Sequence, residues 1–215
     1  MADWLLIRFS NDSGNVEYLT ADAAGRIVTA LRKGPVSAFA QQAAGRRVCV
    51  LVPASDVLLT DAEVPARSGN RIQQIVPFAL EEQLAQDIDS LHFAVGRRVG
   101  EAARIPVAVV SRALVDGWLL QLRGAGLEPE CLYADSSLMP ENPGKAVLVL
   151  SGDSVMLRAA GMPPVTLPLT ALAETLALLR PARTPALATE PDSAATPPAV
   201  AGFGGNGLMV YAGEA

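Results

Sequence analysis

Three short apolar runs open the chain: WLLIRF at residues 4–9, VEYLT at 16–20 and RIVTAL at 26–31. Asn, Asp, Ser and Gly lie between the first two runs and Ala-Gly lies between the last two, a spacing typical of β-hairpins. Residues 36–44 follow with the pattern of a short helix. The continuous apolar run at 48–52 is typical of a strand that is buried on both faces. The opening therefore predicts the order β-β-β-α-β.

A second pattern begins at residue 57 and has the order β-α-β-β-α-β, which is the ferredoxin-like arrangement. Its elements are predicted as strand 57–64, helix 68–88, strands 91–97 and 105–110, helix 112–124 and strand 130–133. Apolar residues three and four positions apart form one stripe along the first of these helices. The stripe consists of Ile72, Ile75, Val76, Ala79, Leu80 and Leu84. Pro77 lies inside the stripe and lacks a backbone donor, so we expect a kink or a break near Gln73 and Gln74.

The third part of the chain repeats the opening pattern. Strands are predicted at 146–150, 154–159 and 165–167, a helix at 169–179, and a last strand at 207–212. Residues 181–201 are crowded with Pro, Ala and Thr and show no periodicity, which predicts a surface loop. The order β-β-β-α-β is the one with which each half of an actin-like or ribonuclease H-like fold begins.

These patterns together predict an α/β fold of the actin-like, ribonuclease H-like class, with two ribonuclease H-like blocks and a ferredoxin-like insert. The predicted domains are a first ribonuclease H-like domain at 1–56, the insert at 57–132, and a second ribonuclease H-like domain at 133–215 that includes the loop at 181–201.

The composition narrows the class of protein. Half of the 215 residues are apolar and 18% are charged, a balance typical of a folded globular chain. The net charge of −5 argues against a nucleic-acid-binding protein, which needs clustered Lys and Arg. The apolar runs are far shorter than the roughly 20 residues of a spanning helix, and the first residues lack the basic start of a signal peptide. We therefore expect a cytoplasmic location.

Several residues that could carry chemistry stand in contexts that do not suit it. Residues 202–207 match G-x-G-x-x-G by letters, but they follow a loop and precede a strand, the reverse of the dinucleotide-binding context. His92 is the only histidine, so no histidine-rich zinc set can form. Cys49 and Cys131 lie in apolar stretches without a C-x-x-C motif, and we expect buried, inert thiols. We predict no catalytic, cofactor-binding or metal-binding residue.

Two predicted hairpins, at Ser10–Gly14 and Ser151–Ser154, would be the phosphate loops of a working actin-like ATPase. Such loops need an Asp for the metal, glycines and a hydroxyl residue in a set order, because backbone donors and Mg²⁺ must surround the phosphates. Each hairpin holds only fragments of that order. Arg8 and Phe9 stand where a metal-holding Asp is expected, so we predict a degenerate nucleotide site.

Acidic residues are concentrated in residues 57–92. This segment holds six acidic and two basic residues, a net −4 out of the chain's −5. One interpretation is a solvated helix face. The other is a docking surface for a basic partner, since complementary charge steers association and sets register.

One long run resembles a known family. VPFALEEQLAQDIDSLHFA at residues 76–94 is similar to the signature of the type II secretion system protein L family, also written GspL. VPASDVLLT at 52–60, VAVVSR at 107–112 and GLEP at 126–129 are similar to other segments of that family. The resemblance spans about residues 4–180 and is strongest from 48 to 135.

This resemblance implies a single-pass inner-membrane protein whose cytoplasmic part has an actin-like fold with degenerate nucleotide loops. In the family that part binds the amino-terminal domain of the secretion ATPase, component E. The family also pairs with component M, forms homodimers, and carries a transmembrane helix and a periplasmic domain after the cytoplasmic part. This sequence ends at Ala215 before any such helix, so we expect the membrane link to lie outside it. We expect the chain itself to lie at the cytoplasmic face of the bacterial inner membrane.

We therefore expect a non-catalytic scaffold that recruits the secretion ATPase and needs no cofactor. The residues predicted to bind this partner are Glu81, Glu82, Asp87 and Asp89, with Arg71 as a possible counter-charge. Two alternatives remain: an active actin-like ATPase or sugar kinase, and the related actin-like assembly protein of type IV pilus machinery. The run at 77–94 favours secretion over pili.

Overall fold

The computed structural model describes residues 3–10, 14–64, 71–97, 104–142, 145–159, 161–179 and 208–212. The chain divides into two compact units, Met1–Leu138 and Met139–Ala215, and each is described by itself. No helix among these residues is long and apolar enough to cross a membrane.

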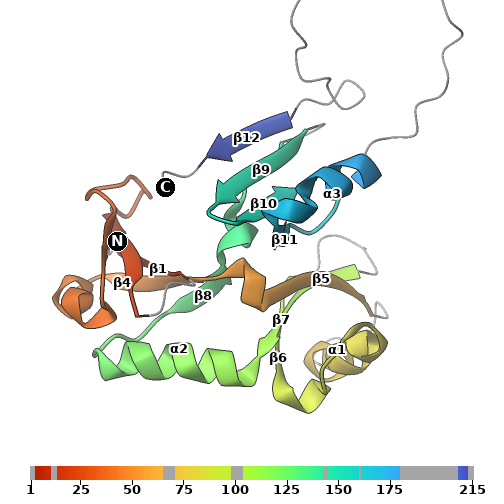
Figure 1. Ribbon diagram of the computed structural model, residues 1–215. Coiled ribbons are helices and arrows are strands. Elements are labelled where there is room, and N and C mark those ends of the chain that lie inside the picture. The colour runs from red at the N-terminus through yellow and green to blue at the C-terminus, as the bar shows by residue number, and fades with distance from the viewer. Residues whose placement is uncertain are drawn as a thin grey trace, which may run out of the picture. The chain divides into compact units, whose positions relative to one another are not determined.

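The first unit contains a five-stranded sheet, of which β1, β4 and β8 are labelled in Figure 1. Its strands are β1 (Trp4–Phe9), β2 (Val16–Ala21), β3 (Arg32–Gly34), β4 (Arg47–Val52) and β8 (Cys131–Ala134), in the order β3-β2-β1-β4-β8. The first three strands are antiparallel, and β1, β4 and β8 are parallel. The 3-10 helix η1 (Val36–Ala43) joins β3 to β4. The predicted β-β-β-α-β order is present.

Alternating side chains of β1 build the core of this unit. Leu5, Ile7 and Phe9 are buried, and they belong to the same apolar cluster as Trp118 and Leu122 of helix α2 (Arg112–Gly124). Burying a large apolar side chain contributes about 1.5–3 kcal/mol. Helix α2 has the predicted bounds and lies along the sheet (Figure 1), and Trp118 and Leu122 mark the face with which it packs.

The third predicted strand is misplaced. Residues 26–31 make only one isolated bridge, between Ala21 and Ile27, and ladder pairing resumes at Arg32–Gly34. The reason is local: the hydroxyl of Thr29 accepts a hydrogen bond from the backbone N–H of Thr20 at 2.9 Å, in the place of a regular ladder bond. Side chains that bond nearby backbone groups compete with the sheet in this way.

A three-stranded antiparallel sheet follows in the same unit. Its strands are β5 (Val57–Glu63), β6 (Leu91–Val95) and β7 (Arg104–Ser111), in the order β5-β7-β6. Helix α1 (Ile72–Leu80) buries Val76 and Leu80 against it. The predicted β-α-β-β-α-β succession is present, but its last strand, β8, pairs with β4 in the five-stranded sheet. The domain boundaries at 56 and 132 remain a prediction.

The predicted helix 68–88 is too long. Helix α1 ends at Leu80 and is followed by two 3-10 turns, η4 (Glu81–Gln83) and η5 (Ile88–Ser90), with extended backbone at Leu84. Pro77 lies inside α1 and cannot donate a backbone hydrogen bond, which weakens the helix just before its end. Residues 68–70 lie outside the described ranges.

The second unit repeats the strand order of the first. Its elements are β9 (Ala146–Ser151), β10 (Ser154–Arg158), β11 (Val165–Pro168), η7 (Leu169–Ala171), α3 (Leu172–Leu179) and β12 (Leu208–Ala212). The sheet order β11-β10-β9-β12 corresponds to β3-β2-β1-β4, including the parallel pairing of the last two strands. The predicted loop 181–201 and the glycines at 202–207 lie outside the described residues.

Candidate functional site

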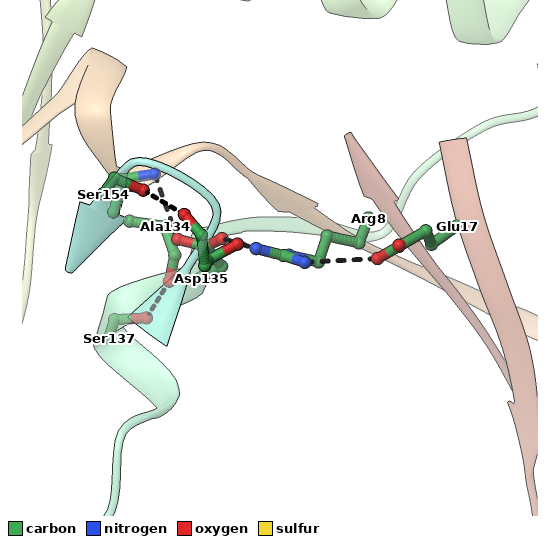
Figure 2. A network of polar contacts seen from close by, with 8 residues as sticks. Arg8, Glu17, Ala134, Asp135, Ser137 and Ser154 are labelled. Atoms are coloured by element: carbon green, nitrogen blue, oxygen red, sulfur yellow. Dashed lines mark hydrogen bonds and ion pairs between the residues drawn. The ribbon is translucent and has the colours of Figure 1, made fainter. Parts of the chain in front are cut away.

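Parallel strands β1, β4 and β8 end at the same edge of the five-stranded sheet, where α/β folds place their ligands. Arg8 lies at the end of β1. Two short 3-10 helices follow the other strands: η2 (Ala54–Asp56) comes after β4, and η6 (Asp135–Leu138) comes after β8. Figure 2 shows the guanidinium of Arg8 lying between the carboxylates of Asp135 and Glu17. This edge is therefore occupied by a polar cluster of Arg8, Glu17, Asp135 and the backbone N–H of Ala54, which we name the Arg8 cluster.

The cluster is closed by direct hydrogen bonds. Nε and Nη2 of Arg8 donate to Oδ2 of Asp135 at 3.0 and 2.9 Å, and Nη1 donates to Oε2 of Glu17 at 3.1 Å. The other oxygen of Asp135 accepts from the backbone N–H of Ala54 at 3.0 Å. The Asp135 side chain is only 10% exposed. One carboxylate thus links the ends of all three parallel strands.

The charge state of Arg8 follows from these contacts. Burial lowers the pKa of Arg8, but hydrogen bonds and charge attraction from Asp135, and then from Glu17, outweigh it, so that the net pKa is raised. The guanidinium stays charged, and it lies where a metal-holding Asp is expected from the sequence in a working actin-like nucleotide site. Its ion pairs occupy Oδ2 of Asp135 and Oε2 of Glu17, oxygens that could otherwise face a metal. Among the residues that the structure describes, no group of three or more His, Cys, Asp or Glu side chains could hold one.

The structure describes the second of the two predicted phosphate hairpins in full and the first only in part. Residues 11–13 of the first lie outside the described ranges. In the second, Ser151 and Ser154 are register partners, so a two-residue turn joins β9 to β10, and Gly152 has a φ of 57° that favours glycine. The hydroxyl of Ser154 donates to the carbonyl of Ser151 at 2.9 Å. That serine therefore closes its own turn.

The two cysteines are neighbours, which their separation in the sequence did not predict. Cys49 of β4 is buried, Cys131 of β8 is half-buried, and the two are register partners in the parallel pair. Burial, and then the adjacent thiol, raise the pKa of Cys49 to about 12. Its thiol is protonated at neutral pH, as expected of a structural cysteine.

The predicted acidic residues lie after helix α1. Glu81 and Glu82 are exposed on η4, and no side chain in the described ranges pairs with either carboxylate. Asp87 has a local role, because its Oδ1 accepts from the backbone N–H of Asp89 at 2.8 Å and caps η5. Asp89 is exposed. Arg71 lies at the start of α1, about 15 Å along the helix from Glu81, too far to neutralise it.

An exposed aromatic residue beside these acids was not among the predicted site residues. Phe78 of α1 is 67% exposed. It lies four residues before Glu82, a spacing that puts two side chains on the same side of a helical segment. The apolar stripe predicted for this helix omits Phe78, so the sequence did contain the signal of an outward-facing aromatic.

Comparisons with known proteins agree with this fold. Among solved structures, the cytoplasmic domain of EpsL, an inner-membrane component of the type II secretion system of Vibrio cholerae, matches with a TM-score of 0.69 at 23% identity, covering 82% of this chain and 75% of that one. The PilM-PilN type IV pilus biogenesis complex matches with a TM-score of 0.54 at 22% identity, covering 82% and 64%. At these identities the likeness shows the fold alone, and it confirms the predicted fold class.

Relatives identified by sequence are informative about the family as well as the fold. Type II secretion system protein L of Pectobacterium carotovorum subsp. carotovorum is 31% identical over 143 residues, which cover 64% of this chain and 33% of that protein. Type II secretion system protein L of Vibrio cholerae serotype O1 is 32% identical over 124 residues, which cover 57% and 29%. The chain spans about a third of the length of these relatives. A family model described as type II secretion system (T2SS), protein L matches residues 5–197, and the chain therefore belongs to that family.

Proposed function

We propose that this chain is a non-catalytic scaffold that recruits the secretion ATPase, component E, to the inner-membrane platform. The observation that carries the proposal is the docking surface, which consists of Phe78, Glu81, Glu82 and Asp89. Its aromatic side chain is exposed and Glu81 and Glu82 have no described side-chain partner. The amino-terminal domain of the ATPase is the proposed occupant.

The docking surface has the composition of a recognition site. Exposed aromatic residues are frequent anchors of protein interfaces, where burial of one side chain supplies much of the affinity. Carboxylates around such an anchor raise the association rate with a basic partner. The helix that carries Phe78 is anchored in the core, because Val76 and Leu80 of the same helix are fully buried against the three-stranded sheet. The partner would therefore meet a preformed surface.

The Arg8 cluster supports the non-catalytic part of the proposal. Actin-like ATPases need a carboxylate at this strand end to hold Mg²⁺, and here Arg8 occupies the position and engages Asp135. Placement at the cytoplasmic face of the inner membrane, pairing with component M and homodimer formation are proposed from membership in the family.

Calorimetric titration of the chain with the isolated amino-terminal domain of the ATPase tests the proposal. The double variant Glu81→Lys/Glu82→Lys should weaken binding at least about tenfold, because it replaces attraction by repulsion. Phe78→Ala should weaken it by a similar or larger factor through loss of the anchor.

Matched controls change equally exposed residues elsewhere on the first unit. Asp116→Lys/Glu128→Lys reverses two exposed acids, and Leu120→Ala removes an apolar side chain that is 74% exposed. Both should bind like the wild type. Unchanged affinity of the docking-surface variants would remove this surface as the ATPase site, and steady hydrolysis of Mg²⁺-ATP by the chain alone would contradict the non-catalytic interpretation.

A further inference from the structure

The loop between β2 and β3 exposes three aliphatic side chains within five residues. Ile27 is 69% exposed, Val28 63% and Leu31 60%. Single exposed apolar residues are normal on a soluble protein, but a dense group marks an interaction site. Among the residues that the structure describes, no other segment exposes three large apolar side chains so close together in sequence.

The backbone under these side chains is fixed. Asp22 accepts hydrogen bonds from the N–H groups of Ala24 and Arg26 through Oδ1, both at 2.9 Å. The N–H of Val28 donates to the carbonyl of Thr20 at 2.8 Å, and Thr20 itself is buried. The loop therefore holds its aliphatic side chains outward instead of folding them onto the core.

Basic residues flank the aliphatic ones. Residues 22–34 contain Arg26, Arg32 and Lys33 against Asp22 alone, and residues 23–55 contain five bases and no acid in a chain of net charge −5. The three bases of the loop are exposed. We use the name basic-aliphatic loop for residues 26–33, which are the end of this loop together with the first two residues of β3.

The chemistry of this loop favours a lipid surface over a protein. Protein interfaces are enriched in aromatic residues, and residues 22–34 contain none. Addition of a partner strand is also disfavoured, because the edge strand β3 has only three residues and carries Arg32 and Lys33, features that block edge pairing. Aliphatic side chains between basic ones match the boundary of an anionic bilayer, which buries the former and attracts the latter.

We propose that the basic-aliphatic loop inserts Ile27, Val28 and Leu31 into the surface of a bilayer rich in anionic phospholipid, with Arg32 and Lys33 at the headgroups. Arg26 is exposed but pairs with Asp22 at 2.8 Å, so it is not counted among the headgroup contacts. This contact orients the β3 edge of the first unit toward the membrane. It uses no residue of the docking surface, so the two proposals fail or succeed separately.

Vesicle flotation of this chain tests the proposal. The probes are vesicles of phosphatidylglycerol and phosphatidylethanolamine, compared with vesicles of phosphatidylcholine alone. The chain should float with the anionic vesicles at low salt and less so at high salt. Each base near an anionic surface strengthens binding about fivefold, so Arg32→Glu/Lys33→Glu should reduce the bound fraction more than tenfold.

A second variant, Ile27→Ser/Val28→Ser/Leu31→Ser, removes the aliphatic part and should abolish the binding that remains at high salt. The matched control Leu120→Ser/Arg123→Glu changes an exposed Leu and an exposed Arg of α2 and should bind like the wild type. Far-ultraviolet circular dichroism and thermal unfolding confirm that each variant is folded.

Three results would overturn the inference. The first is absence of flotation with anionic vesicles. The second is an equal loss of vesicle binding in the loop variants and in the α2 control. The third is a fall in molar mass by light scattering when the triple Ser variant replaces the wild type, which would assign the loop to contact between protein chains.

Discussion

Two charged regions of the first unit differ in whether their charges have partners. In the Arg8 cluster, one guanidinium and the carboxylate of Asp135 satisfy each other and join three strand ends. On the docking surface, Glu81 and Glu82 face solvent without a described side-chain partner. Paired charges inside a fold mainly determine its structure, whereas unpaired charges on a surface contribute little to stability and are available for recognition. The comparison contrasts a cluster with a structural role with a surface for which we propose a binding role.

The largest expected effect on stability is at Asp135. Asp135→Ala leaves the N–H of Ala54 and two donors of Arg8 without their acceptor, and we expect the free energy of unfolding to fall by about 2 kcal/mol, a value discounted because Arg8 is partly solvated. Urea denaturation measures this. Glu17→Ala is the matched control, since it removes the more exposed carboxylate of the cluster, and its effect should stay within about 1 kcal/mol. Equal effects of the two variants would show that Asp135 is not the centre of the cluster.

The second prediction concerns the docking surface, where we expect a small effect on stability and a larger effect on binding. Glu81→Lys/Glu82→Lys should change the free energy of unfolding by less than about 0.5 kcal/mol, because neither carboxylate has a described partner to lose. The same variant should slow association with the ATPase domain in stopped-flow experiments, and the difference from wild type should shrink as salt is added. A loss of stability comparable to that of Asp135→Ala would mean that the two acids act structurally.

Much of the fold could be predicted from local sequence signals. Turn residues between apolar runs placed β1 and β2. The bounds of α2 were correct because Gly124 and Gly126 follow its last buried residue, Leu122, and Gly126 has a φ of 73° that favours glycine. The helix predicted at 68–88 was too long because the spacing of Leu84 continues the stripe, although the chain leaves the helix after Leu80. Periodicity alone does not show that the helix ends before its apolar stripe does.

The candidate site was predictable only in part. The acidic residues were visible as a charge concentration, and Phe78 could have been found as the large apolar residue outside the stripe. The pairing of Arg8 with Asp135 could not, because the two residues are 127 positions apart and meet only through the parallel register of β1, β4 and β8. The basic-aliphatic loop was predicted as a strand, since the apolar pattern of residues 26–31 gives no sign of the hydrogen bonds made by Thr20 and Asp22.

The smallest expected effect on stability is at Asp22. Its carboxylate is more exposed to solvent than that of Asp135, but like that of Asp135 it has hydrogen-bond partners. The backbone N–H of Arg26 has the largest effect and lowers the pKa of this carboxyl; desolvation raises it, but the side chain of Arg26 and the N–H of Ala24 lower it further, so the net pKa is lowered. A lowered pKa means that the ionised form stabilises the folded loop above the unfolded pKa of about 3.9 and that this contribution is lost as the pH falls through the folded value. The wild type should therefore be slightly more stable than Asp22→Asn at neutral pH, and the difference should disappear under acid. Urea denaturation of both proteins over this range measures it, and a difference that persists at acid pH would show that the turn depends on the shape of the side chain and not on its charge.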